Sequence, residues 1–180
     1  MTPRANPFWR FSLRTYREPG VQEACLALQD RCGADVNLLL FCGWTGRDGR
    51  VLDEASLRSA VARVGHWQSE VIAPLRLARR GLKRQLGDPA VGELAAPLRK
   101  RVLGLELQLE RVEQTLLADL AAQWSPPAPR LPAWQAIANN LAAYLQLMGE
   151  PAGPAEVANL ACIAQACSPR DSEAATQQAQ

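Results

Sequence analysis

Four basic residues near the middle of the chain have the spacing to bind an anion together. They are Arg76, Arg79, Arg80 and Lys83, the last three lying three, four and seven residues after the first. At 3.6 residues per turn, this spacing places all four on one face of a helix. A helix face of cations without acidic residues between them attracts phosphate groups or an acidic protein surface.

The segment around this face is basic as well. Residues 76–101 contain eight basic and two acidic residues, a net charge of +6, whereas the whole chain carries +2. We expect the face to bind an acidic protein surface, with RNA or DNA as the alternative partner. No aromatic residue interrupts the basic run, which disfavours a stacking surface for single-stranded nucleic acid. A third interpretation is that the cations are solvated or pair with acids such as Glu106, Glu110 and Glu113.

Two polar residues, Asp35 and Asn37, precede the apolar run Leu38 to Cys42. Burying an unpaired amide costs about 1–3 kcal/mol, so Asn37 needs hydrogen-bond partners. Asp35 has the position of a helix N-cap, where a side-chain oxygen accepts bonds from free backbone amides. We therefore expect Asp35 to cap a helix and Asn37 to tie its first turn to neighbouring elements.

The alternative is that this polar pair belongs to a small-molecule pocket or an enzyme site. Gln29 and Asp30 would then share its polar floor, and tryptophans would form its walls. The residues of this candidate pocket are Trp9, Asp35, Asn37, Trp44, His66 and Trp67.

Other residue types with catalytic or metal-binding potential lack the spacing that such chemistry requires. His66 is the only histidine, and a lone histidine more often packs at a helix edge than acts as an acid or base. The five cysteines do not have zinc-site spacings, and neither a nucleophile elbow nor a glycine-rich phosphate loop occurs. We expect no catalytic residue, no metal and no cofactor.

The elements that must position these residues are helices, because apolar residues recur three and four apart along most of the chain. We expect an all-α helical bundle in which a long antiparallel pair, Asp53–Leu86 and Pro89–Trp124, packs on short N-terminal helices. Pro74 should kink or break the first of the pair. The expected units are a helical domain (1–124), a proline-rich linker (125–132), a C-terminal helical pair docked on the same core (133–167) and a disordered tail (168–180).

The first half of the chain resembles a known family. Residues 8–46 read FWRFSLRTYREPGVQEACLALQDRCGADVNLLLFCGWTG, and residues 66–83 read HWQSEVIAPLRLARRGLK. These strings are similar to a proteobacterial family of small conserved helical proteins of unknown function, with weaker similarity around AIANNLAAYL. The resemblance implies a bacterial, cytoplasmic, helical protein, and it implies no activity or cofactor.

These observations lead to one expected function and two alternatives. The apolar runs are much shorter than the 18 or more residues of a membrane span. The N-terminal residues lack the apolar segment of a secretion signal, and the odd number of cysteines fits free thiols in a reducing compartment. We expect a non-enzymatic cytoplasmic interaction or adaptor protein that uses the basic face. The alternatives are an RNA- or DNA-binding protein and a small-molecule-binding protein or enzyme.

Overall fold

The computed structural model describes residues 6–124, 130–149 and 152–169, and in these ranges every regular element is a helix. The all-α prediction is therefore confirmed. The elements are α1 (Pro7–Thr15), α2 (Val21–Cys32), α3 (Val36–Gly46), α4 (Glu54–Trp67), the π-helix η1 (Gln68–Ile72), α5 (Ala73–Arg84), α6 (Gly92–Ala122), α7 (Ala133–Leu147) and α8 (Pro154–Cys167).

Several helices begin or end at capping residues that can be recognised in the sequence. The Asn6 side chain accepts bonds from the backbone amides of Phe8 and Trp9 at the start of α1. Asp35 caps α3 in the same way, as predicted. Gly33 ends α2 with a positive φ of 66°, a conformation that favours glycine at helix C-termini.

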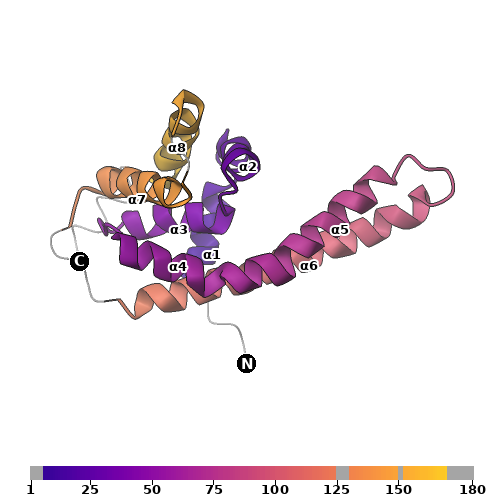
Figure 1. Ribbon diagram of the computed structural model, residues 1–180, viewed down its shortest axis with the longest axis horizontal. Coiled ribbons are helices and arrows are strands. Elements are labelled where there is room, and N and C mark those ends of the chain that lie inside the picture. The colour runs from indigo at the N-terminus through magenta and orange to yellow at the C-terminus, as the bar shows by residue number, and fades with distance from the viewer. Residues whose placement is uncertain (1–5, 125–129, 150–151, 170–180) are drawn as a thin grey trace.

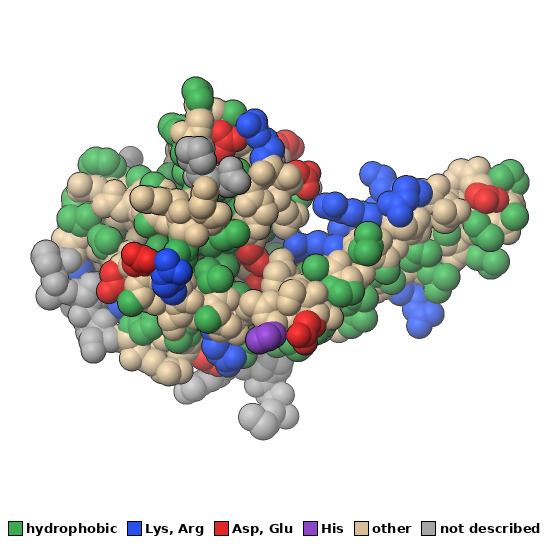
Figure 2. All heavy atoms as spheres, in the orientation of Figure 1, with side chains coloured by type: hydrophobic (Ala, Val, Ile, Leu, Met, Phe, Trp, Pro, Cys, Tyr) green, Lys and Arg blue, Asp and Glu red, His purple; other side chains and the backbone are tan. Residues whose placement is uncertain are grey.

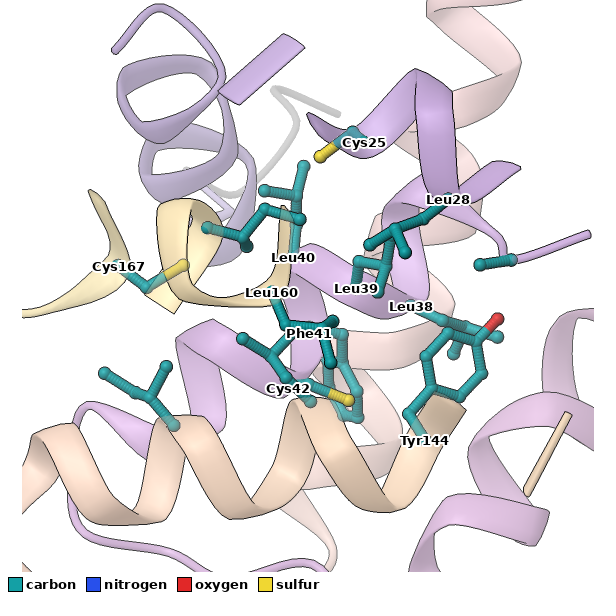
Figure 3. Packing of buried hydrophobic residues seen from close by; sticks show 14 of the residues in the cluster. Cys25, Leu28, Leu38, Leu39, Leu40, Phe41, Cys42, Tyr144, Leu160 and Cys167 are labelled. Carbon is teal, nitrogen blue, oxygen red and sulfur yellow. The ribbon is translucent and has the colours of Figure 1, made fainter. Parts of the chain in front are cut away.

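Helix α3 lies in the middle of the cluster that it forms with α1, α2, α7 and α8 (Figure 1). Its residues from Asn37 to Gly43 are all buried, and other helices surround it. Figure 3 shows Leu39 and Phe41 of α3 among side chains from α2, α7 and α8, including Leu28, Tyr144 and Leu160. At Gly46 the α3 backbone passes so close to α7 that an added Cβ would lie 2.7 Å from Ile137 Cα. The apolar run is thus the centre of the core.

A helical hairpin extends away from this core (Figure 1). It consists of α5 and the antiparallel first half of α6, residues 92–107, and we call it the arm; the remaining helices form the body. Helix α6 has 31 residues, which corresponds to roughly 46 Å at 1.5 Å per residue. None of the residues of α5 is buried, so every residue of this helix is at least partly accessible to solvent.

Pro74 does not end its helix. The wider turns of η1 come immediately before it, and the Ala73 amide bonds the carbonyl of Gln68, five residues earlier. A π turn is a common way to accommodate an irregularity inside a helix. The chain therefore runs from α4 through η1 into α5, and one helical path joins the body to the arm.

Helices α7 and α8 share the core with the N-terminal helices, because Ile137, Leu141, Tyr144 and Ile163 belong to the same buried cluster as Phe8 and Leu39. Most of the expected linker (residues 125–129) and nearly all of the expected tail (170–180) lie outside the described residues. In the described part of the chain, no helix is both long enough and apolar enough to cross a membrane.

Candidate functional site

A cleft of about 410 Å³ lies between the arm and the body. Its walls come from α1 and the turn after it, from α2 and α3 on the body, and from α5 and α6. In Figure 2, basic side chains gather along one side of the arm, next to the body. Three of the predicted basic-face residues, Arg76, Arg79 and Arg80, line the cleft, and so do Trp9 and Asn37 of the predicted pocket. The structure thus brings parts of both candidate sites together.

The rim of the cleft is apolar on both sides. Leu13 and Leu26 stand on the body side, and Leu103 and Leu107 stand on α6; all four are exposed. Trp9 completes this lining, with the Arg111 guanidinium 5.8 Å above its ring centre. Exposed leucines on facing walls lose unfavourable contact with water when something covers them.

Two of the four predicted cations are neutralised inside the cleft. Arg76 Nε lies 3.1 Å from Glu106 Oε1, and its Nη2 lies 2.7 Å from Glu110 Oε1. Arg79 Nε lies 2.6 Å from Glu106 Oε2. Their side chains are only 15% and 23% exposed. Arg76 and Arg79 therefore attach α5 to α6, as in the interpretation that paired them with acids of the long helix.

The other two cations stay on the surface. Arg80 reaches across the mouth of the cleft toward Asp30 of α2, at 3.6 Å, and both side chains are more than half exposed. Lys83 is exposed one turn farther along α5. An ion pair between exposed side chains contributes little to stability, typically about 0–1 kcal/mol. Arg80 can therefore exchange Asp30 for another anion at small cost.

Asn37 connects the body to the long helix. Its Nδ2 donates to Glu113 Oε2 at 2.8 Å, and its Oδ1 accepts from Gln114 Nε2 at 2.7 Å. The prediction that Asn37 ties the start of its helix to neighbouring elements is confirmed. Asn37 faces the cleft, but both ends of its amide are already engaged by α6.

Behind Asn37 lies a pair of buried carboxyl groups, Asp35 and Glu113. The pKa of Glu113 is raised to about 9, first by burial and then by the negative charge of Asp35, while the bond from Asn37 opposes the shift. Burial also raises the pKa of Asp35. Asp35 Oδ2 and Glu113 Oε1 are both buried and have no hydrogen-bond donor among the described residues, so a proton on Glu113 would supply the missing donor between them. At neutral pH Glu113 therefore keeps its proton and is the hydrogen-bond donor to the Asp35 carboxylate.

The six residues of the predicted pocket do not form one site. Asp35 lies behind Asn37 and is not in the cleft wall. Trp44 stacks on Phe8 in the core with ring centres 5.1 Å apart. Trp67 donates its indole N–H to the Leu109 carbonyl at 3.0 Å. His66 is 92% exposed and lies 3.4 Å from Glu70. The grouping of Trp44, His66 and Trp67 with Asn37 is thus corrected, because each points toward a different neighbour.

The sequence analysis named acids of the long helix only as partners for the cations and did not place that helix in the wall of a pocket. Glu106, Glu110 and Gln114 line the cleft and are spaced four residues apart, so they lie along one side of α6. Acidic residues at that spacing, in a helix expected to pair with a basic one, were the available signal.

One comparison with known proteins finds a relationship. A family model described as a protein of unknown function, DUF2390, matches residues 7–117, which is more than half of the chain. The chain belongs to the DUF2390 family. No curated protein and no solved structure matches it.

The DUF2390 segment contains every residue that lines the cleft, from Trp9 to Gln114. Helices α7 and α8 lie outside it. The cleft is thus a feature of the family segment, and α7 and α8 complete the core beneath it.

Proposed function

We propose that this DUF2390 protein is a non-enzymatic interaction or adaptor protein of the bacterial cytoplasm, which binds an anionic partner through its arm. The observation that carries the proposal is that two of the four cations are paired inside the arm and two are exposed. Arg76 and Arg79 hold the arm together, whereas Arg80 and Lys83 remain on the surface beside the cleft. Arg80 and Lys83, with neighbouring Arg84, supply positive charge, because Glu106 and Glu110 pair with Arg76 and Arg79 instead.

The apolar surface of the arm supports a protein partner. Leu77 is 66% exposed and Leu94 is 68% exposed. Exposed leucines next to arginines are typical of protein interfaces, whose centres are apolar and rich in arginine.

The test is recovery of partners from the native host. Tagged wild-type protein is compared with a double variant, Arg80→Glu with Lys83→Glu, by affinity purification and mass spectrometry that includes bound RNA. A matched control, Arg10→Glu with Arg63→Glu, makes the same charge change at exposed cations outside the cleft wall. We expect the arm variant to lose its specific partner and the control to keep it. If both variants recover the same partners as wild type, the proposal is wrong.

Nucleic acid is the second candidate, because the same exposed cations suit phosphate groups. Binding to a fluorescent RNA or DNA duplex would weaken steeply with salt, since phosphate contacts release counterions. Loss of nuclease-sensitive material from the arm variant alone would favour this candidate over an acidic protein.

A small-molecule pocket is the third candidate, and the volume of the cleft favours it. About 410 Å³ lies within the range of about 300–1,000 Å³ typical of ligand pockets. Against it, the Asn37 amide already has partners at both ends. A metabolite that raises the melting temperature of wild type, but not of a Trp9→Ala variant, would support this candidate.

A further inference from the structure

The cleft and the exposed cations meet at one place, and together they define the chemistry of a partner. Arg80 belongs both to the surface cations and to the cleft wall, and Arg17 lines the same cleft from the turn after α1. Both cations are exposed. The same cleft is lined by the exposed leucines of both walls, so a partner would meet positive charge and apolar surface together.

The leucines point to an occupant larger than a metabolite. Ligand pockets bury most of a small molecule in a concave space, whereas Leu13, Leu26 and Leu107 are each more than a third exposed on the rim. A small ligand inside the cleft would leave much of that rim in water. A polypeptide segment that lies along the cleft would cover it.

Spacing on α6 fits a helical occupant. Leu103 and Leu107 are four residues apart and line the cleft, so they form a one-turn apolar ridge. Amphipathic helices bind such grooves with apolar residues at positions i, i+3 or i+4, and i+7. Acidic residues beside that apolar stripe would face Arg17 and Arg80.

We infer that the cleft binds an acidic amphipathic helix of a partner protein, with the apolar side of that helix against Leu13, Leu26, Leu103 and Leu107 and its carboxylates at Arg17 and Arg80. This inference rests on the proposed function, since it specifies the anionic partner. On binding, a carboxylate of the partner replaces Asp30 next to Arg80.

The opposite side of α6 provides an internal comparison. Leu105 is 46% exposed and Leu107 is 47% exposed, but only Leu107 lines the cleft. Replacing either residue by glutamate has the same chemical effect at nearly equal exposure. A difference in binding between the two variants therefore reports on the cleft and not on general solubility or charge.

The test uses a displayed library of random 16-residue peptides selected on the full-length protein. We expect enriched peptides to combine Asp or Glu with Leu, Phe or Trp at helical spacing. A synthetic copy of an enriched peptide should bind at least about tenfold more weakly to Leu107→Glu, Leu103→Glu and Arg80→Glu than to wild type, and equally well to Leu105→Glu. Circular dichroism melting verifies that each variant is folded.

The outcomes separate this inference from the proposed function. If Arg80→Glu with Lys83→Glu loses the host partner while Leu107→Glu keeps it, the basic arm is used and the cleft inference is wrong. Failure to enrich peptides, enrichment of basic peptides, or equal binding to Leu105→Glu and Leu107→Glu would overturn it as well. If Leu107→Glu turns a dimer into a monomer in sedimentation experiments, the occupant is a second copy of the chain, which also contradicts the inference.

Discussion

The Asn37 amide donates a 2.8 Å hydrogen bond to the Glu113 carboxyl, and this contact joins the central helix α3 to the helix that continues into the arm. The bond lies directly beneath the cleft, since Asn37 and neighbouring Gln114 are in its wall. The position of the cleft walls therefore depends on a small buried polar network, whose members can be tested one by one.

Replacing Asn37 by leucine should destabilise the fold strongly. Leucine has a similar size but leaves Glu113 and Gln114 without their partner, and each orphaned buried group costs about 1–3 kcal/mol. Urea denaturation should show a loss of about 2 kcal/mol or more in the free energy of unfolding. Gln29→Leu changes another amide of the cleft wall, one that is only half-buried, and should cost much less. Equal losses in the two variants would contradict this assignment.

The Asp35–Glu113 pair should make stability depend on pH. The pKa of Glu113 is about 9 in the folded protein, mainly because of burial, against about 4.3 in an unfolded chain. The folded state therefore holds the proton more tightly. This stabilisation is complete below pH about 4 and is lost as pH rises toward 9.

Glu113→Gln should remove that dependence, because glutamine can accept from Asn37 and donate to Asp35 as the protonated acid does. Near pH 5.5 wild type and variant should differ little, whereas near pH 8.5 the variant should be more stable by about 1 kcal/mol or more. The measurement is urea unfolding at both pH values. A constant difference between the proteins would show that Glu113 does not titrate as proposed; Arg76 and Glu110, the charged neighbours, are the same in both.

Gly46→Ala should destabilise the crossing of α3 and α7. The new methyl group would lie 2.7 Å from the Ile137 backbone, and such overpacking typically costs about 1–3 kcal/mol. Gly65→Ala is the matched control, because a Cβ there meets nothing within 4 Å and alanine favours a helix by up to about 1 kcal/mol. Thermal melting should thus shift in opposite directions. A rise in melting temperature for both variants would be incompatible with the close approach at Gly46.

Arg76→Leu should loosen the arm. It leaves the mostly buried Glu110 without its cation, whereas Glu106 keeps Arg79, and removing one partner of a buried pair costs up to about 3–5 kcal/mol. Amide hydrogen exchange in residues 73–84 should become faster than in wild type. Arg58→Ala removes an exposed pair with Glu54. It should leave the exchange rates of α5 unchanged and the free energy of unfolding within about 0.5 kcal/mol of wild type. Unchanged exchange in α5 after Arg76→Leu would refute the role of this pair.

Much of the fold was predictable because its helix ends carry local signals. Asn6 and Asp35 cap their helices, and Gly33 ends one, through contacts with residues at most five positions away. The apolar periodicity of α6 likewise predicted a long helix. Such features depend on near neighbours, and sequence patterns report on near neighbours.

The cleft was less predictable because its walls come from residues far apart in the chain. Arg76 meets Glu110 across 34 positions, and Asn37 meets Glu113 across 76. The sequence pointed to Trp9, Asn37 and the arginines separately, but it held no sign that they share a wall. The same limitation explains why Trp44 and Trp67 were placed in the pocket: tryptophan types are visible in sequence, whereas the direction of each ring is set by its packing neighbours.

The crossing of α3 and α7 has a consequence for how the protein can be divided. The family segment ends at residue 117, yet α7 buries Ile137, Leu141, Tyr144 and Leu145, and the Tyr144 hydroxyl accepts from the Asp35 amide at 2.9 Å. Burial of each such side chain contributes about 1.5–3 kcal/mol, so the four together match the 5–15 kcal/mol by which a typical domain is stable. A chain cut at residue 117 would keep every cleft residue and lose the fold, which makes the unit that folds larger than the unit that defines the family.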